Sequence, residues 1–330
     1  MISIDLPPAD WHRMRASHEE FVGTRTAAHR ERRAAGQKHP VEDFLFTYYP
    51  FKPGKIAQWH PGAGRRVLLA DVADAEAFHR RWYRVVPAPT EAPADAEVPA
   101  GTGGQGASAA VAGGGADPAV YGYAEVDTAA WYADRGEGAR FVVDLLQRTL
   151  ARPGTFNCFG LHEWAMVYKL REGERRHEQV PLRLSRAETD AVVEAHRIGC
   201  SHFDAYRFFT PAAEPLNELR PERATMTAME QPGCLHGNMD LYKWAMKLGP
   251  VVPSHLVRRA FELAVEIRAT DMEASPYDVR PWGYGVVAIE TAEGKAEYVR
   301  RQRDFADRGN DLRRDLLAEI ARVPELSDMF

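Results

Sequence analysis

The chain has 330 residues, of which 45% are hydrophobic and 27% are charged, a composition typical of a globular protein with a sizeable core. Its formal net charge of −5 argues against a general nucleic-acid coat protein or an anionic-membrane binder, which usually presents a net basic face. Three cysteines are too few for a disulfide framework, so we expect reduced thiols and a cytoplasmic protein. We also expect no membrane association, because neither a signal peptide nor a bilayer-spanning apolar run is visible.

The first part of the chain predicts helices separated by short strands. Residues 10–36 predict a long polar helix that begins at Asp10 and stops at Gly36. Residues 39–49 are apolar on almost every side and predict a buried element. A short strand at 67–70 and a helix at 74–84 follow. Residues 85–120 are rich in Pro, Ala and Gly and carry no Lys or Arg, which predicts a disordered insertion.

The second part of the chain is also mainly helical in pattern. Apolar periodicity predicts helices at 136–151, 161–170, 185–196, 239–248, 254–270 and 294–323, with strands at 180–184 and 285–290. Ser185 and Glu188 form a capping-box pattern, Ser254 is a candidate N-cap, and Gly309 is a candidate kink. The fold class is therefore mainly α, or α+β with a few short strands. We expect a single compact helical domain made of residues 1–84 and 121–330, with 85–120 inserted in it.

Reactive side chains gather between residues 157 and 244. All three cysteines lie there, each close to a histidine: Cys158 with His162, Cys200 with His202, and Cys234 with His236. Thiolates, imidazoles and carboxylates are the ligands of zinc and iron, so a divalent metal such as Zn or Fe is one hypothesis. The candidate ligands are histidines with carboxylates nearby: His39, His60, His162, His202, His236, Glu163 and Asp204. No known metal spacing is present, and the alternative is buried thiols with hydrogen-bonded core histidines.

General acid–base chemistry is a second hypothesis for the same stretch. Burial raises the pKa of a carboxyl group and suits it to proton transfer near neutral pH. The candidate catalytic residues are His162, Glu163, His202 and Asp204, and the further carboxylates considered are Asp43, Glu230 and Asp240. The alternative is that these carboxylates are paired with Arg183, Arg207 or Lys243 and are structural. Cys158, which precedes a predicted helix, is a candidate nucleophile.

Aromatic residues are unusually dense around these motifs. A subset could line a pocket for a planar ring, although packing in the core is their usual role. The candidate substrate-binding residues are Tyr48, Tyr49, Trp59, Trp164 and Tyr242.

Several long motifs resemble those of one known family. They include Cys158-Phe-Gly-Leu-His-Glu-Trp-Ala-Met-Val-Tyr168, Gln231-Pro-Gly-Cys-Leu-His236 and Asp271-Met-Glu-Ala-Ser-Pro-Tyr-Asp278. The chain resembles, over nearly its whole length except 85–120, an actinobacterial family commonly labelled 3-methyladenine DNA glycosylase. The resemblance implies hydrolysis of the N-glycosidic bond of an alkylated purine in DNA, with basic residues of 13–33 and 300–314 holding phosphates.

Two other functions remain open from the residues themselves. One is a metal-dependent enzyme that acts on a small molecule through the His, Glu and Asp cluster. The other is a metal- or ligand-binding protein without turnover.

Overall fold

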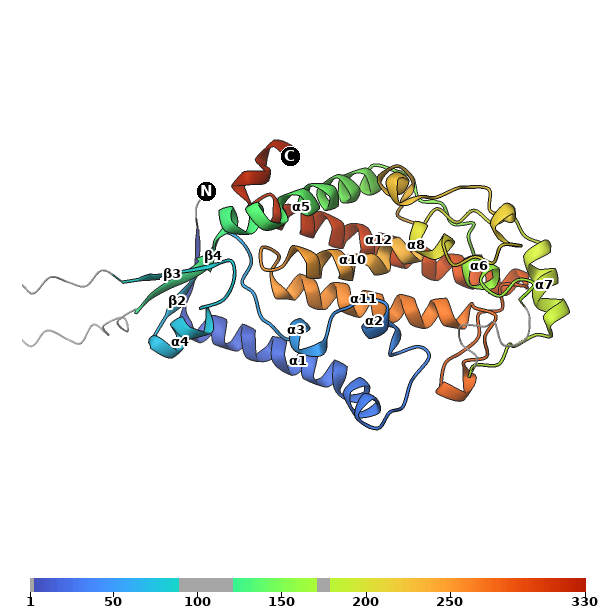
Figure 1. The fold of residues 1–330 in the computed structure, drawn as a ribbon, viewed down its shortest axis with the longest axis horizontal. Helices are drawn as coiled ribbons and strands as arrows, with labels where there is room; N and C mark the ends of the chain where they lie inside the picture. The colour runs from blue at the N-terminus through green and yellow to red at the C-terminus, as the bar shows by residue number, and fades with distance from the viewer. Residues whose placement is uncertain (1–2, 89–120, 171–178) are drawn as a thin grey trace, which may run out of the picture.

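The computed structural model describes residues 3–88, 121–170 and 179–330 and shows a mainly helical protein with one small sheet. The expected fold class is therefore confirmed. Figure 1 shows long helices packed side by side, with the sheet at one end of the molecule. In the described part of the chain, no helix combines the length and the apolar character needed to cross a bilayer.

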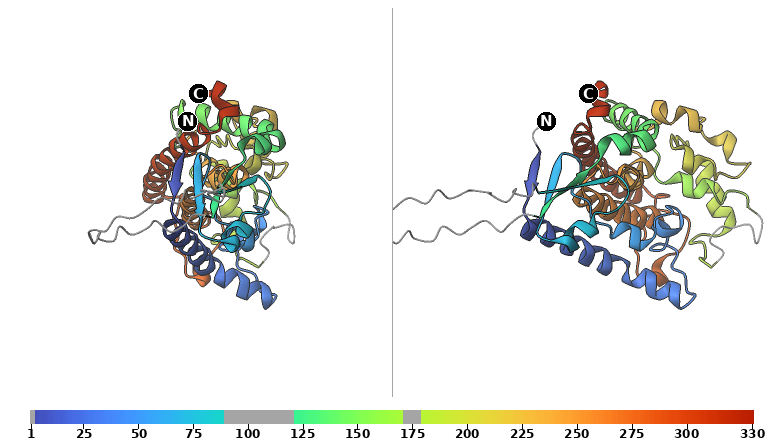
Figure 2. Two further views of the ribbon diagram at one scale, coloured as in Figure 1. Left: turned by 90° about the vertical axis from the view of Figure 1, so that its left-hand side faces the viewer. Right: turned by 60° about the vertical axis from the view of Figure 1, so that its left-hand side comes forward.

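The sheet has four strands in the order β1-β2-β4-β3. Strand β1 (Ile4–Leu6) pairs in parallel with β2 (Arg65–Leu69), and β2 pairs antiparallel with β4 (Gly122–Val126). Strand β3 (Tyr83–Pro87) pairs antiparallel with β4 and forms an edge. Figure 2 shows the sheet beside the start of the first long helix, away from most of the helical bundle.

A small apolar cluster joins the sheet to helix α1 (Pro8–Ala34) and α4 (Val72–Ala77). The Trp11 ring of α1 is fully buried, stacks on Trp59 at 6.1 Å, and donates its indole N–H to the Leu68 carbonyl at 2.9 Å. Trp59 is thus a packing residue at the sheet end of the protein.

The main core is built around α10 (Leu235–Leu248), which is buried along most of its length. Helix α11 (Ser254–Glu273) packs along α10, and α12 (Ala292–Ile320) contacts both of them. Helix α5 (Thr128–Leu150) lies against α12 on the opposite side from α11 in Figure 1. The remaining helical turns α2 (Phe44–Thr47), α3 (Pro53–Ile56), α6 (Leu161–Ala165), α7 (Arg186–Glu194), α8 (Phe203–Tyr206) and α9 (Met226–Met229) surround this bundle.

Gly309 allows α12 to lie close against α10. A Cβ atom at this position would lie 2.3 Å from the Asn238 side-chain oxygen of α10. Helix α12 continues through Gly309 without interruption. The glycine predicted as a kink is therefore explained by close packing between two helices.

Several local predictions were wrong. Residues 285–290 form no strand, because the backbone N–H groups of Gly285 and Val287 are bonded to Glu273 at the end of α11. Residues 180–184 contribute only an isolated bridge between Leu182 and Tyr277. Strands β1 and β4 were not predicted.

Other boundaries changed. The predicted helix at 74–84 ends at Ala77, and its last residues enter β3. The predicted insertion starts too early, since residues 85–87 belong to β3; residues 89–120 lie outside the described part of the chain. The Ser185 capping box is confirmed, whereas Pro253 precedes α11 and Ser254 makes no cap bond there.

Candidate functional site

The three histidines of the Cys–His couples meet in the interior. His162 comes from α6, His202 precedes α8, and His236 lies in the first turn of α10. The His236 ring lies between the other two, with centroid distances of 4.4 Å to His162 and 5.3 Å to His202. All three side chains are buried. Segments far apart in the sequence thus form one imidazole cluster.

The cysteines contribute less to the histidine cluster than their position beside the histidines in the sequence suggested. The Cys200 thiol contacts the His202 carbonyl at 3.7 Å, and the Cys234 sulfur accepts the Gly237 N–H at 3.5 Å. Burial raises the pKa of both thiols, which keeps them protonated and unreactive. Only Cys158 approaches a histidine directly, with its sulfur 3.7 Å from Nδ1 of His162.

His162 is paired with a carboxylate from α11. Its Nε2 lies 2.8 Å from Oδ1 of Asp271, and both side chains are at most 4% exposed. Burial alone would raise the pKa of Asp271, but the charge and hydrogen bond of His162 hold it well below its usual value. Burial would lower the pKa of His162, and the Asp271 charge instead raises it well above normal. The ionised carboxylate accepts, so His162 Nε2 donates.

Arg268 links this pair to Glu163. Its Nη1 donates to Oδ2 of Asp271 at 2.9 Å and to Oε1 of Glu163 at 3.1 Å. Arg268 and Asp271 are three residues apart on α11, so they project from one helix face. Burial raises the pKa of Glu163 and the charge of Asp271 raises it further, while Arg268 opposes both.

A second carboxylate lies behind His202. Oδ2 of Asp240 lies 3.2 Å from His202 Nε2 and also pairs with the Lys243 ammonium. The Tyr49 hydroxyl donates to Oδ1 of Asp240 at 2.6 Å. Burial would raise the pKa of Asp240, but Lys243 and His202 hold it well below its usual value.

His236 differs from its two neighbours because it has no carboxylate partner. Its Nδ1 is buried and makes no hydrogen bond with any described residue. Burial lowers its pKa well below normal, and the charge of His162 lowers it further, so the ring is neutral. A neutral imidazole with an unpartnered nitrogen is the form that binds a metal ion.

The ligand atoms of His162, His236 and Asp271 lie within 4.8 Å of one another. Zinc binds nitrogen and oxygen ligands at about 2.0–2.2 Å, so modest side-chain adjustments would bring all three onto one ion. A cavity of about 60 Å³ adjoins this triad; its lining includes Glu163, His236 and Arg268 together with Phe44, Tyr48, Asp204, Phe208 and Tyr277.

The buried charges near the triad balance when His162 is protonated. Four buried carboxylates, namely those of Glu163, Glu230, Asp240 and Asp271, face three cations, namely Lys243, Arg268 and Arg313. The raised pKa of His162 favours the proton that supplies the fourth positive charge. Burial of an unbalanced charge is costly, so loss of this proton would require another cation in its place.

The predicted residues separate into those near the triad and those elsewhere. His162, His202, His236 and Glu163 are brought together, and Tyr48 and Asp204 line the cavity. Tyr49 contacts Asp240 and packs edge-on against Tyr242 at 5.6 Å. Trp164 is fully buried and donates to the Ala274 carbonyl at 2.9 Å, which is a packing role.

His39 does not join the triad. Its Nδ1 accepts the backbone N–H groups of Val41 and Glu42, at 3.2 and 3.1 Å. Its own backbone N–H donates to Asp43, whose carboxylate also pairs with His29 and Arg32 of α1. His39 therefore organises the turn after α1.

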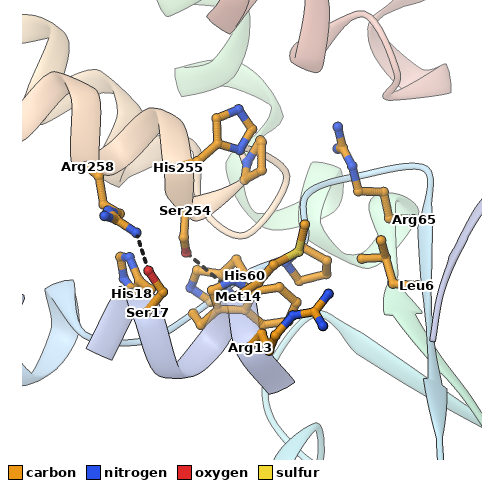
Figure 3. A pocket seen from close by; sticks show the side chains of 13 residues that line it. Leu6, Arg13, Met14, Ser17, His18, His60, Arg65, Ser254, His255 and Arg258 are labelled. Carbon is orange, nitrogen blue, oxygen red and sulfur yellow. Dashed lines mark hydrogen bonds between the residues drawn. The ribbon is translucent and has the colours of Figure 1, made fainter. Parts of the chain in front are cut away.

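His60 lies in a different pocket, shown in Figure 3. This pocket of about 460 Å³ lies between α1 and the start of α11 and shares no lining residue with the cavity beside the triad. The His60 backbone N–H donates to the Ser254 hydroxyl at 2.8 Å, and its Nδ1 lies 2.8 Å from the Tyr83 hydroxyl. Burial and the nearby Arg80 charge lower the pKa of His60 to about 3.

Asp271 and Arg268 were not among the predicted site residues. One pattern could have identified Asp271. It lies four residues after Ile267, at the next position of the apolar stripe that runs along α11. A charged residue on a buried stripe needs a partner, and here that partner is His162.

Comparisons with protein-family models, with curated proteins and with solved structures find no match to this chain.

Proposed function

We propose that the protein is a metal-dependent enzyme that acts on a small molecule, with a divalent cation held by His162, His236 and Asp271. The observation that carries this proposal is the buried triad itself, whose ligand atoms from three separate helices lie within 4.8 Å of one another. The cavity beside it favours an enzyme over a protein that only stores metal, since a substrate atom could reach the triad there.

The donor set fits zinc or iron. Both metals accept a donor set of two imidazoles and one carboxylate, and three protein ligands leave a coordination position for substrate. The unpartnered Nδ1 of His236 fits a cation, which would take the place of the proton on His162. The bound metal would act as a Lewis acid on a substrate oxygen.

The surrounding side chains have separate roles in this proposal. Arg268 holds the second oxygen of Asp271 and thereby fixes the carboxylate orientation. Glu163 lines the cavity, and burial raises the pKa of its carboxyl group, which favours the protonated form that a general acid needs. His202, fixed by Asp240, packs against the His236 ring and limits its rotation.

Metal analysis of gently purified protein tests the proposal. We expect about one zinc or iron per chain, with loss of most of it in His236→Gln and retention in the matched control His60→Gln. Sub-stoichiometric metal in the wild type, or equal loss in both variants, would contradict it.

An N-glycosidic hydrolase, as the family resemblance implies, is the second candidate. It is favoured by one observation: Glu163 lies in a cavity walled by Phe44, Tyr48, Phe208 and Tyr277. Aromatic walls with a carboxylate suit a planar, cationic leaving base. We rank it second because about 60 Å³ is far below the roughly 300 Å³ of ordinary ligand pockets.

Many of the arginines predicted to hold DNA phosphates are already paired with carboxylates of this chain. On α12, Arg300, Arg308 and Arg314 are each paired with a carboxylate, and on α1 the same holds for Arg13, Arg15, Arg25 and Arg32. Release of methylated base from alkylated duplex DNA, measured against Glu163→Gln, tests this second candidate. Equal release by both proteins would exclude it.

A cytoplasmic location remains part of the proposal. It is supported by the three free cysteines, which suit a reducing compartment.

A further inference from the structure

A larger groove lies beside the candidate site, between α5, α8 and α10. Its volume is about 650 Å³, within the range of small-molecule sites. Its lining combines cationic and aromatic side chains from separate segments: Arg135 and Phe141 of α5, Phe203 of α8, Arg223 of the turn η2 (Arg223–Thr225), and Lys243, Trp244 and Lys247 of α10. We call this the basic groove.

Three cations of the basic groove have no carboxylate partner among the described residues. They are Arg135, Arg223 and Lys247, whereas most other surface arginines of the described chain are in ion pairs. Lys243 differs, because it is paired with Asp240 and Asp204. Burial lowers the pKa of Lys247, and the charge of Lys243 lowers it further. Arg135 also lies over the Trp82 ring at 5.3 Å and is next in sequence to Asp134, which is paired with Arg81. Cations that line one groove without an ion pair indicate a place where an anion would bind.

The charge of the groove fits a dianion. Of its two acidic residues, Asp204 is paired with Arg207 and Lys243, and Glu137 is exposed. Three free cations against one free carboxylate leave two positive charges. A phosphate monoester carries about −1.5 to −2 at neutral pH, which matches this excess.

One wall of the groove is aromatic. Trp244 is buried, and Phe141 packs edge-on against it at 6.0 Å while remaining 38% exposed. The Lys243 and Lys247 ammonium groups lie 4.3 and 5.2 Å from the Trp244 ring centroid. The exposed Phe141 ring offers a face for a planar group, and the ammonium groups lie beside it.

The groove leads toward the triad. Asp204 lines both the basic groove and the small cavity, and Lys243 lines the groove while holding Asp240, the partner of His202. A ligand anchored in the groove would therefore have one end near the polar centre. We propose that the basic groove binds a small molecule carrying a phosphate group and a planar ring, and that this molecule is the substrate of the metal centre. The second half of this inference rests on the proposed function.

The test is direct binding, measured by isothermal titration calorimetry on the full chain. The probe is phenyl phosphate, compared with cyclohexyl phosphate, which lacks the planar ring, and phenol, which lacks the phosphate. We expect saturable one-to-one binding of phenyl phosphate and weaker binding of both comparison compounds. Equal binding of cyclohexyl phosphate, or no binding of phenyl phosphate, would overturn the proposal.

Two substitutions locate the site. Arg223→Gln and Lys247→Gln replace exposed side chains, so folding should persist, and each should weaken binding about tenfold, as expected for loss of a charged hydrogen bond. Arg303→Gln, an exposed arginine of α12 without an ion pair in the described chain, is the matched control and should leave binding unchanged. Equal effects of all three would overturn the assignment.

The result can be separated from the metal proposal. Binding is measured with and without prior chelation, because the groove residues are not metal ligands. Binding that survives chelation would support the groove. Absence of metal from the purified protein before chelation would separately contradict the metal centre and leave the groove standing. A duplex oligonucleotide that binds where phenyl phosphate does not would replace the small-molecule proposal with a nucleic-acid surface.

Discussion

His162 and Asp271 are joined by a hydrogen bond of 2.8 Å in the interior, although they are 109 residues apart in the sequence. This bond fixes α6 against α11 and gives His162 a defined donor nitrogen. It is also the contact that sets the triad, because His236 approaches the same two side chains from α10. Structure and candidate chemistry therefore depend on the same pair.

Removal of the Asp271 carboxylate should be strongly destabilising. Asp271→Ala leaves His162 buried without its anion and leaves Arg268 with Glu163 alone, and removal of one partner of a buried pair costs about 3–5 kcal/mol. Urea unfolding measures this loss. Asp311→Ala, which removes an exposed ion pair with Arg314, should cost roughly 0–1 kcal/mol. Similar losses of unfolding free energy in the two variants would show that the buried His162–Asp271 pair stabilises the fold no more than an exposed ion pair does.

Metal should stabilise the fold if the triad holds it. A ligand that binds only the folded state at 100 times its Kd adds about 2.7 kcal/mol. Thermal unfolding of chelator-treated protein should therefore shift upward when zinc is added back. His236→Gln should show no such shift, whereas His60→Gln should behave like the wild type. An equal shift in His236→Gln would place the metal elsewhere.

Asp43 should make stability depend on pH. Burial would raise its pKa, but hydrogen bonds from Arg32, His29 and the His39 backbone lower it. A carboxylate with a lowered folded-state pKa stabilises above its unfolded pKa of about 4, and the contribution is lost as the pH falls through the folded value. Asp43→Asn should therefore cost about 1.5–3 kcal/mol at pH 7 and progressively less below pH 4.

The same measurement on Asp10→Asn provides the comparison for Asp43. Asp10 lies near the start of α1 in an exposed pair with Arg13, so its loss should change little at either pH. A pH-independent cost for Asp43→Asn would mean that its charge is unimportant.

Gly309 and Gly138 should respond in opposite directions to alanine. Alanine favours a helix over glycine by about 1 kcal/mol, so Gly138→Ala in α5, where a Cβ atom meets nothing within 4 Å, should stabilise by about 0.5–1 kcal/mol. At Gly309 the new atom would clash with Asn238, which Arg313 and the Pro232 carbonyl hold in place. Overpacking costs about 1–3 kcal/mol and should outweigh the gain. Stabilisation of both variants in urea unfolding would contradict this packing.

The sequence predicted what local periodicity encodes. Helices α11 and α12 were found because each repeats its apolar residues at helical spacing. The polar helix α1 was found from its expected end residues instead. The wrong strand at 285–290 has the right apolar content, but Glu273 accepts the backbone N–H groups of Gly285 and Val287, and no strand of the described chain pairs with this segment. Strand pairing depends on distant partners, so short strands are not determined by their own residues.

Only part of the candidate site was predicted, because its partners also come from distant segments of the chain. The three Cys–His couples marked the segments that supply His162, His202 and His236. They could not show that Asp271 faces His162, that His39 caps a local turn, or that His60 contacts Tyr83 in a separate pocket. A histidine that caps backbone N–H groups and one that faces a cavity have the same local sequence pattern, and only the tertiary fold separates them.

The hairpin ends of β3 and β4 have a practical consequence. Ala88 donates its N–H to the Tyr121 carbonyl at 2.9 Å, so the chain leaves and re-enters the sheet at adjacent positions. Doubling the length of a flexible connection costs only about 0.6 kcal/mol of loop-closure free energy. A longer insertion between Ala88 and Tyr121 should therefore change the stability of the sheet little. This junction is therefore a natural place to graft a fluorescent reporter or an affinity handle, at the end of the molecule where the sheet lies.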